Sequence, residues 1–393
     1  MPTRTPIEVS IAVAKAVQQA DVDVIAAYPI TPQTHIVEHL SELVANGELQ
    51  ANFMNVESEH SAISAMVGAA AVGASTFTAT SAQGLALMHE ILFITASLRL
   101  PIVMVVANRA LSGPISIWND HSDIMAERDI GWIQVFCETG QEAYDAILHA
   151  FRVVRDPSVM LPMAVNIDGF NLTHVIEPIY LFDPEELGDY LPEHRQSLKL
   201  DIDHPITMGP VGIPEVYTEA KKQVEDALIN SKQVILAAWQ EFGRRFGRDY
   251  APIETYRVEG AQILLVTMGV ISRTAMGAVD RLRDAGQAVG LVRCRLWRPF
   301  PLPEFREAVR QASVIAVVDR HISLGAHSGP VGQEVRSALY NLPSRPQVFG
   351  FVLGLGGRDV TVHDFFEIVE LAERYASQGP PESEYTHIGL REV

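Results

Sequence analysis

The strongest constraint on the fold of this chain is a series of short apolar runs that alternate with longer segments of helical pattern. The clearest run is Pro101–Ala107 (PIVMVVA), which has no polar side chain and is followed directly by Asn108 and Arg109. Such a run is typical of a central parallel strand that helices cover on both faces. Because parallel strands need crossover connections and the segments between the runs have helical pattern, we expect an α/β fold.

The first 170 residues carry this alternation throughout and predict a doubly wound domain over residues 1–170. We expect its helices over residues 7–19, 33–46, 59–72, 85–96 and 141–154. We expect its strands over residues 22–27, 51–56, 76–80, 101–107, 135–138 and 161–168. Residues 171–255 are less regular and include several prolines, so we interpret them as a connecting arm with a helix from Tyr217 to about Glu241.

A second α/β unit is expected over residues 256–378. It opens with an apolar strand that runs into a turn at Gly269, followed by a helix that Gly286 caps. Its first strands and helices are expected over residues 261–268, 274–285, 289–295, 303–312 and 314–319. The glycine-rich stretch 353–359 (LGLGGRD) matches no phosphate-binding fingerprint and is interpreted as a turn. Residues 379–393 are expected to form a C-terminal arm.

The charge balance and the cysteine content argue against several classes of protein. The formal net charge of -18 disfavours nucleic acid and anionic membrane surfaces as partners, because both are bound mainly through Lys and Arg. No apolar run reaches membrane-spanning length and the first residues do not resemble a signal peptide, so a cytoplasmic protein is expected. Cys137 and Cys294 are too few and too far apart in sequence for an iron–sulfur site, and we expect this chain to hold no metal.

The first candidate site follows the expected strand 22–27, in the turn Tyr28–Gln33 (YPITPQ). Ligands of open α/β sheets bind beyond the carboxyl ends of the strands, where helix N-termini offer backbone N–H groups. Thr31 would point its hydroxyl into that crevice, with a proline on either side of Ile30-Thr31 fixing the turn. Alternatively, Thr31 only caps the helix that starts at Pro32, and the two roles are compatible.

The second candidate is an acidic motif at the start of the expected helix 59–72, Val56–Ala62 (VESEHSA). A carboxylate there, from Glu57 or Glu59, is stabilised by the helix dipole and would ordinarily be a surface cap. In the functional interpretation, the carboxylate points into a cleft between subunits. Burial then raises its proton affinity, and it shares a proton with a heterocyclic nitrogen.

The third candidate is Arg109, directly after the buried strand 101–107. A charged side chain at the carboxyl end of a central strand seldom contributes to packing, and a guanidinium can grip a carboxylate through two parallel hydrogen bonds. We therefore favour a binding role over a packing role. The next segment, residues 117–123 (IWNDHSD), is interpreted as a lid or a wall, and its His121 has no Cys or spaced His partner to suggest a metal ligand.

These motifs together resemble the alpha subunit of multi-subunit pyruvate:ferredoxin oxidoreductases, within the 2-oxoacid:ferredoxin oxidoreductase family. The segments that carry the resemblance are 28–32 (YPITP), 56–62 (VESEHSA), 78–90 (TATSAQGLALMHE), 107–112 (ANRALS), 118–123 (WNDHSD) and 295–301 (RLWRPFP). They extend over almost the whole chain. The resemblance implies a doubly wound domain that binds the pyrimidine of thiamine diphosphate, followed by an α/β domain like the carboxy-terminal domain of transketolases.

The resemblance also implies that the chain is active only with partner subunits. A beta subunit is expected to bind Mg²⁺ and the diphosphate of the cofactor, beta and delta subunits to hold [4Fe–4S] clusters, and a gamma subunit to assist coenzyme A. Ferredoxin is the expected electron acceptor, and a dimer of heteromers is the expected assembly. The sequence has no Gly-Asp-Gly motif with a downstream Asn, which agrees with a diphosphate that another subunit binds.

Site residues follow from the resemblance by motif. Glu59 matches the acid that activates the cofactor, with Glu57 as the second choice, and the turn residues Tyr28 and Pro29 are expected to bind the cofactor as well. Thr31 and Arg109 match the residues expected to hold the 2-oxoacid. The implied reaction is the coenzyme A-dependent oxidative decarboxylation of a 2-oxoacid to an acyl-CoA.

Pyruvate is the favoured substrate. Relatives that oxidise oxalate are expected to carry a larger cationic residue where Thr31 stands, so a small hydroxyl there argues for a monocarboxylate. A branched 2-oxoacid is the nearest alternative, and oxalate is a further one. Two interpretations of another kind stay open: a non-catalytic scaffold subunit of an electron-transfer complex, and a self-sufficient transketolase-like enzyme, which the missing diphosphate motif disfavours.

Overall fold

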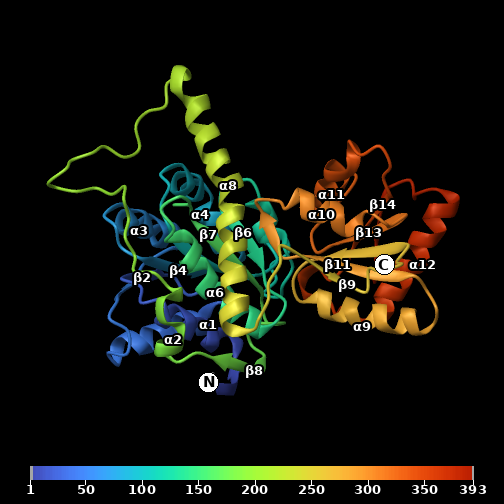
Figure 1. Ribbon diagram of the computed structural model, residues 1–393, viewed down its shortest axis with the longest axis horizontal. Coiled ribbons are helices and arrows are strands. Elements are labelled where there is room, and N and C mark those ends of the chain that lie inside the picture. The colour runs from blue at the N-terminus through green and yellow to red at the C-terminus, as the bar shows by residue number, and fades with distance from the viewer. Residues whose placement is uncertain (1–2, 392–393) are drawn as a thin grey trace.

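The computed structural model describes residues 3–391, which form two α/β units beside each other (Figure 1). The sheet of the first unit contains the strands β2 (Val24–Ala27), β3 (Asn52–Asn55), β4 (Thr76–Thr80), β5 (Ile102–Asn108), β6 (Ile133–Phe136), β7 (Met163–Asp168) and β12 (Leu296–Arg298). Their order across the sheet is β12-β6-β7-β5-β4-β2-β3. All neighbouring strands run parallel except β12, which is antiparallel to β6.

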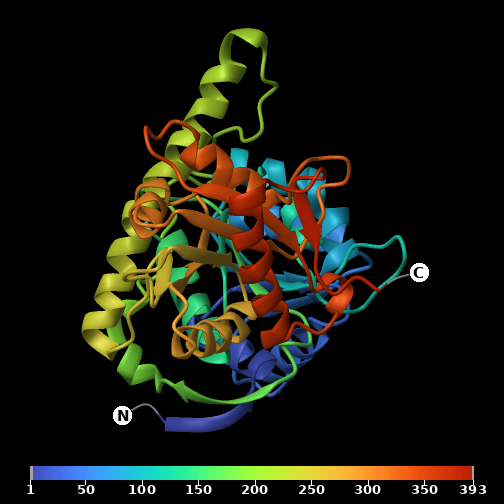
Figure 2. The same cartoon turned by 90° about the vertical axis from the view of Figure 1, so that its right-hand side faces the viewer.

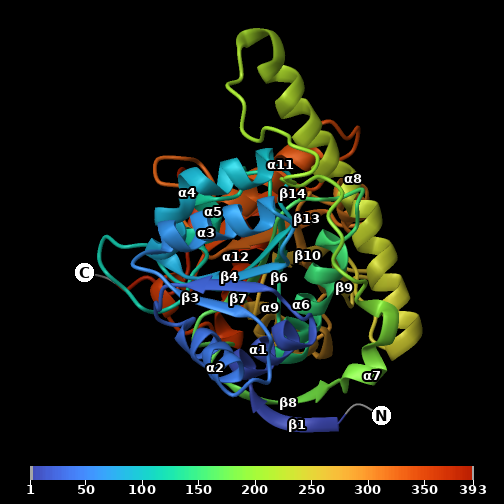
Figure 3. The same ribbon diagram turned by 90° about the vertical axis from the view of Figure 1, so that its left-hand side faces the viewer.

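The helices of the first unit are α1 (Val9–Gln19), α2 (Thr34–Ala45), α3 (Glu59–Ala71), α4 (Ala82–Ser97), α5 (Ser122–Ala126), α6 (Gly140–Val154) and α8 (Pro214–Phe246). Figure 3 shows α3 and α4 on one side of the sheet and α1 and α2 on the other. One apolar cluster lies against α1, α2, α6 and α8, and a second lies against α3 and α4. β5 is buried along its whole length, which confirms that both faces of the run Pro101–Ala107 are covered.

The second unit has a sheet of β9 (Ile253–Tyr256), β10 (Ile263–Thr267), β11 (Val289–Cys294), β13 (Val314–Asp319), β14 (Gln347–Val352) and β15 (Tyr385–His387). Their order is β15-β14-β13-β10-β11-β9, with β9 antiparallel to β11 and the other neighbours parallel. Its helices are α9 (Ile271–Asp284), α10 (Leu302–Val309), α11 (Pro330–Tyr340) and α12 (Val362–Gln378). The expected cap of α9 is confirmed, because Gly286 has a φ of 85° and its N–H donates to the carbonyl of Arg283 at 2.9 Å.

One strand of the first unit's sheet comes from the sequence of the second unit. β12 follows β11 of the second unit directly, yet it pairs with β6 and forms the last strand of the first unit's sheet. Trp297 in the middle of β12 is completely buried. The chain therefore returns from the second unit to complete the sheet of the first.

The N-terminus and the expected connecting arm differ from the sequence prediction. The first helix, expected over residues 7–19, begins only after β1 (Thr3–Glu8), which pairs antiparallel with β8 (Ile176–Leu181). Pro6 lies opposite Pro178 in this ladder. Prolines are uncommon within strands, so their presence in both partners hides the pattern from the sequence. The segment 171–255 is thus more regular than expected.

Helix α8 and the C-terminus also differ from prediction. The short helices α7 (Pro184–Leu187) and η1 (Gly188–Tyr190) precede α8, whose first turns project beyond the body of the molecule (Figures 1 and 2). Residues 211–220 are all exposed, so no buried stripe marks the start of this helix in the sequence. The tail was expected to be an extended arm, but it contributes the edge strand β15. Within residues 3–391, no helix is both long and apolar enough to cross a membrane.

Candidate functional site

Glu59 is the first residue of α3, which follows β3 after a connection of residues 56–58, and its side chain is buried. The cap of α3 is Ser58, whose hydroxyl accepts a hydrogen bond from the N–H of Ser61 at 3.2 Å. The carboxylate of Glu59 is therefore not needed to cap the helix. The surface-cap interpretation of Glu59 is wrong, because the exposed fraction of this residue is only 6%.

The surroundings of Glu59 form a polar cradle at the first turn of α4. A Cβ atom on Gly84 would lie 2.5 Å from Glu59 Oε1 and 2.5 Å from Thr80 Oγ1, so only glycine leaves room for the carboxylate here. The buried hydroxyls of Thr80 and Ser81 have no hydrogen-bond partner among the described residues. Unpaired buried hydroxyls are uncommon in folded proteins, and beside a buried carboxylate they suit a polar ligand.

Glu57 has a different environment. It is exposed, and its carboxylate accepts a hydrogen bond from the hydroxyl of Ser61. That hydrogen bond lowers the pKa of Glu57 and so favours the ionised carboxylate. A group that exchanges a proton with a ring nitrogen needs a higher proton affinity than this. The geometry therefore favours Glu59 over Glu57 as the acid of the site.

The second part of the candidate site joins the turn after β2 to the end of β5. Arg109 Nη1 donates to the carbonyl of Thr31 at 2.9 Å, and Arg109 Nε donates to the carbonyl of Ser116 at 2.7 Å. Burial lowers the pKa of Arg109, and the charge of Asp123 opposes that change. No hydrogen bond from Nη2 occurs within the described part of the chain, which leaves this nitrogen for an incoming carboxylate.

Thr31 does not cap α2. That helix begins at Thr34, its cap position is Gln33, and no side chain makes a capping hydrogen bond there. Instead, Gln33 Nε2 donates to the carbonyl of Tyr28 at 2.8 Å, which closes the turn. Tyr28, Pro29 and Thr31 are exposed at the tip of this turn. The capping alternative is thus wrong, and the Thr31 hydroxyl is open to a ligand.

Asp123 connects the two parts of the site, and the sequence did not reveal this role. Its Oδ2 accepts from the backbone N–H of Ala82 at 3.1 Å and from that of Arg109 at 2.9 Å. Burial raises the pKa of Asp123 to about 7, against the effect of its hydrogen bonds. The carboxylate therefore joins the loop after β4, which leads into the cradle of Glu59, to the loop that carries Arg109. Its position at the end of the polar, aromatic segment 117–123 is the available signal.

The segment 117–123 is a wall rather than a free lid. Asn119, Asp120 and His121 are buried at the boundary with the second unit, and Trp118 is half exposed. His121 Nε2 lies 3.0 Å from Asp168 Oδ1. No group of three or more His, Cys, Asp and Glu side chains suited to a metal ion occurs in the part of the chain that the structure describes.

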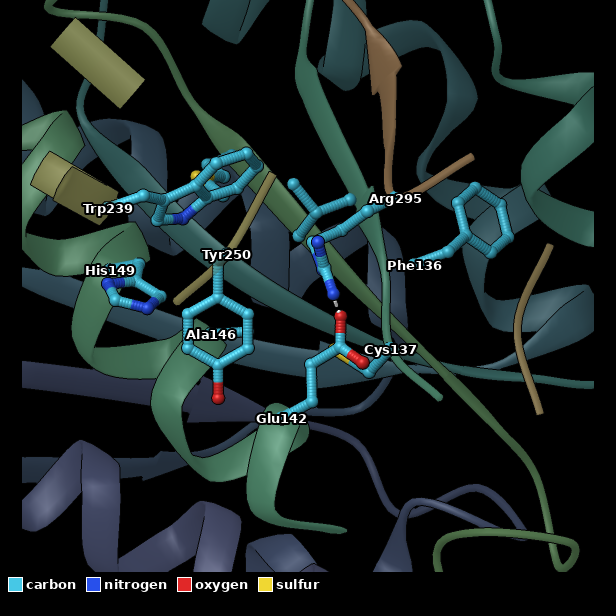
Figure 4. Close-up of a pocket in the computed structure, with 10 residues that line it drawn as sticks. Phe136, Cys137, Glu142, Ala146, His149, Trp239, Tyr250 and Arg295 are labelled. Carbon is cyan, nitrogen blue, oxygen red and sulfur yellow. Dashed lines mark hydrogen bonds and ion pairs between the residues drawn. The ribbon is translucent and has the colours of Figure 1, made fainter. Parts of the chain in front are cut away.

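A small internal cavity lies away from these residues, on the α6 and α8 side of the first unit's sheet. Figure 4 shows Arg295 pointing at the carboxylate of Glu142, with the rings of Tyr250, His149 and Trp239 nearby. Burial lowers the pKa of His149 to about 3, so this imidazole is neutral at physiological pH. The cavity contains none of the predicted site residues and belongs to the junction between the units.

Two family models match the chain. One, described as pyruvate flavodoxin/ferredoxin oxidoreductase, thiamine diphosphate-binding, matches residues 15–238, and the other, pyruvate:ferredoxin oxidoreductase core domain II, matches residues 261–365. Among solved structures, a 2-oxoglutarate:ferredoxin oxidoreductase from Magnetococcus marinus superposes with a TM-score of 0.70 at 19% identity, over 94% of this chain and 65% of that chain. A chain of a split-gene transketolase gives a TM-score of 0.55 at 13% identity, over 94% of this chain and 98% of that one. The predicted fold class is confirmed.

Curated relatives are similar over nearly the full length. Pyruvate synthase subunit PorA of Methanocaldococcus jannaschii is 50% identical over 92% of this chain and 93% of its own length. PorA of Pyrococcus furiosus is 47% identical over 100% and 99%. Ketoisovalerate oxidoreductase subunit VorA of Pyrococcus horikoshii is 42% identical over 98% and 97%. On these matches, the chain belongs to the thiamine diphosphate-binding pyruvate flavodoxin/ferredoxin oxidoreductase family.

Proposed function

We propose that this chain is the alpha subunit of a pyruvate:ferredoxin oxidoreductase, which converts a 2-oxoacid and coenzyme A to an acyl-CoA and carbon dioxide and passes electrons to ferredoxin. One observation carries the proposal: the buried carboxylate of Glu59 and the unpaired hydroxyl of Thr80 both lie next to Gly84, and Asp123 joins the start of α4 to the loop of Arg109. The PorA relatives are named as pyruvate synthase subunits, which supports pyruvate. The pyrimidine-binding domain is assigned to residues 1–170 and the transketolase-like domain to residues 256–378.

The residues around Glu59 fit the aminopyrimidine of thiamine diphosphate. When bound, this cofactor supplies the electron sink that lets a 2-oxoacid lose carbon dioxide. Glu59 holds a proton between its carboxylate and the ring nitrogen of the cofactor. The hydroxyls of Thr80 and Ser81 are available to polar atoms of the ring, and the exposed turn of Tyr28 and Pro29 would help to hold it.

Arg109 and Thr31 hold the substrate in this proposal. Arg109 Nη2 donates to the carboxylate of the 2-oxoacid, while Nε and Nη1 keep the guanidinium fixed. The Thr31 hydroxyl donates to an oxygen of the same substrate. This pair offers one cation to one carboxylate, which favours a monocarboxylate over oxalate. A branched 2-oxoacid is the second candidate, because VorA of Pyrococcus horikoshii is named a ketoisovalerate oxidoreductase subunit.

Partner subunits supply the remaining groups. We assign Mg²⁺ and the diphosphate of the cofactor to a beta subunit, [4Fe–4S] clusters to beta and delta subunits, and coenzyme A binding to a gamma subunit, in a dimer of heteromers. The relatives' designation as one subunit of pyruvate synthase supports a multi-subunit complex. The cytoplasmic location expected from the sequence stays a prediction.

The assembled complex provides the test of the function. Reduction of ferredoxin or viologen is measured with pyruvate, 2-oxoisovalerate, 2-oxoglutarate and oxalate, each with and without coenzyme A. We expect the highest kcat/KM with pyruvate and a strict need for coenzyme A. If the complex binds thiamine diphosphate and turns over normally after Glu59→Ala and Thr31→Ala together, the scaffold interpretation is correct instead.

Arg109→Ala should lower kcat/KM for pyruvate about 10- to 100-fold, mainly through KM, because hydrogen bonds to charged groups contribute about 1.5–3 kcal/mol. Binding of thiamine diphosphate, followed by fluorescence titration, should stay within about twofold. Arg310→Ala is the matched control, since Arg310 is exposed and pairs only with Glu307 on its own segment among the described residues. An unchanged KM for pyruvate in Arg109→Ala would show that this guanidinium does not bind the substrate.

Gly84→Ala should lower turnover roughly tenfold, because the added Cβ would overlap Glu59 Oε1 and push the carboxylate out of position. Gly277→Ala is the control for a glycine within a helix, since the nearest atom to its added Cβ is 3.9 Å away. Steady-state viologen reduction at saturating pyruvate measures both variants. Full activity of Gly84→Ala would mean that the position of Glu59 does not matter for turnover.

A further inference from the structure

The loop that links Arg109 to α5 is held by the second unit. The glycine-rich stretch of the second unit forms the short helix η2 (Leu355–Gly357), which lies against residues 116–120 of this loop. Gly357 N donates to the carbonyl of Asn119 at 2.7 Å, and Gly356 N donates to Asp120 Oδ2 at 3.0 Å. Two consecutive backbone N–H groups of the second unit thus donate hydrogen bonds to the loop.

Glycine is required in this turn for two reasons. Gly356 and Gly357 have φ values of 55° and 77°, in the left-handed region where side chains are strained. A Cβ on Gly357 would also lie 2.3 Å from Trp118 Cβ, closer than any real contact. The turn is therefore shaped to receive the loop, and this accounts for a motif that matches no phosphate-binding pattern.

Arg320, which directly follows β13, also holds this loop, and we call Arg320 and the turn Gly354–Gly357 together the clasp. Its Nη2 donates to Asn119 Oδ1 at 2.5 Å, its Nη1 donates to Asp168 Oδ1 at 2.8 Å, and its carbonyl accepts from His121 N at 2.9 Å. Arg320, Asn119 and Asp168 are all buried. A buried ion pair with these additional hydrogen bonds holds a single geometry, so the loop is fixed on both sides of Asn119.

The fixed loop in turn holds Arg109 and its neighbour Ala110 through hydrogen bonds. The carbonyl of Ser116 accepts from Arg109 Nε at 2.7 Å, and the carbonyl of Trp118 accepts from Ala110 N at 3.0 Å. Both acceptors lie within three residues of Asn119. A continuous series of hydrogen bonds therefore connects the second unit, through the loop, to the guanidinium of Arg109.

We propose that Arg320 and the turn Gly354–Gly357 are positioning residues for substrate binding, because they fix the loop whose Ser116 carbonyl orients Arg109. The second unit thereby sets the affinity of the first unit's site for the 2-oxoacid. This proposal rests on the proposed function, in which Arg109 binds the substrate carboxylate. It assigns to the second unit a role in selecting the substrate, in addition to packing against the first.

The test uses the assembled complex and two variants of the clasp. Gly357→Ala adds the clashing atom, and Asn119→Ala removes the side chain that Arg320 holds without adding an atom. Each should raise KM for pyruvate about tenfold and change kcat less than about threefold, with thiamine diphosphate affinity unchanged. Gly286→Ala is the matched control, because Gly286 has a φ of 85° but no atom within 4 Å of an added Cβ.

A double variant separates this proposal from the proposed function. In an Arg109→Ala background, Gly357→Ala should raise KM by less than about twofold further, since the guanidinium that it positions is already gone. If Arg109→Ala alone leaves KM unchanged, the proposed substrate site is wrong. If Arg109→Ala raises KM but Gly357→Ala and Asn119→Ala behave like Gly286→Ala, or if they lower kcat and cofactor binding instead, the positioning role is wrong while the substrate site stands.

Discussion

Glu59→Gln is expected to slow turnover of the assembled complex by about 10²- to 10⁴-fold, the range that a positioned acid–base group contributes. The amide is nearly the same size as the carboxylate and fits the space above Gly84, so the cradle should stay intact. It cannot exchange a proton with the cofactor ring, however. Viologen reduction at saturating pyruvate and coenzyme A gives the turnover number, and gel filtration checks that the subunits still assemble.

Glu57→Gln is the matched control for Glu59→Gln, because Glu57 lies two positions earlier and is exposed. Its replacement removes a surface charge but keeps an oxygen that can accept from Ser61, so it should change turnover less than about twofold. The reverse outcome, a large loss in Glu57→Gln and little loss in Glu59→Gln, would transfer the acid role to Glu57. Equal losses in both would indicate a general effect on the start of α3.

The second large effect is expected at the junction between the units. Glu142 of α6 accepts hydrogen bonds from Arg293 and Arg295, which come from the second unit's β11 and the residues that follow it. All three side chains are buried. Removing one partner of a buried ion pair leaves the other charge unpaired, so Glu142→Gln should lower the free energy of unfolding by about 3–5 kcal/mol at pH 7. Glu370→Gln, on the exposed face of α12, should change it by less than about 0.5 kcal/mol.

The effect of Glu142→Gln should depend on pH in a defined direction. Burial raises the pKa of Glu142, but the charges of Arg293 and Arg295 outweigh burial and bring it to about 2. In the unfolded chain a Glu has a pKa of about 4.3, so the stabilisation is complete above that pH and is lost as pH falls towards 2. Denaturant unfolding of wild type and Glu142→Gln at pH 7, 5 and 3.5 measures the difference, which should shrink at pH 3.5. A constant difference would mean that Glu142 is not charged in the folded chain.

The wild-type curve by itself would not isolate Glu142. Burial raises the pKa of the neighbouring Glu138, so protonation of Glu138 stabilises the folded state as pH falls and acts in the opposite direction. The charge of Glu142 also raises the pKa of Glu138, and both carboxylates pair with Arg293, so the contribution of Glu138 does not cancel between wild type and Glu142→Gln. The same comparison in a Glu138→Gln background removes the titration of Glu138 from both chains.

The sequence predicts those parts of the fold in which local pattern and final environment agree. The strand over residues 76–80 is found at those residues, and the run Pro101–Ala107 is buried on both faces as its composition requires. The strand β1 was missed because Pro6 stands in it, and its pairing partner lies far away in sequence. The helix predicted from Tyr217 begins at Pro214, because its first turns are exposed and burial imposes no periodic pattern on them.

The candidate site likewise contains residues that the sequence predicts and residues that it does not. Glu59, Thr31 and Arg109 are identifiable from the ligand-binding edge of the sheet, because Glu59 begins a helix, Arg109 directly follows a strand and Thr31 lies in the turn between β2 and α2. The role of Asp123 depends on two backbone N–H groups that come from different loops, which no local pattern records. The turn at Gly357 is recognisable as a turn, but its partner Trp118 becomes apparent only once the chain is folded.

Because β12 is synthesised well after its partner β6, the sheet of the first unit stays incomplete for part of translation. β6 leaves the ribosome long before β12 does, and until then its outer backbone groups have no partner. An unpaired strand edge can associate with other chains, so a nascent or truncated polypeptide that ends before Leu296 exposes a surface prone to aggregation. The earlier half of the protein is therefore not a self-contained folding module. Its sheet is completed only when the residues after β11 have been translated.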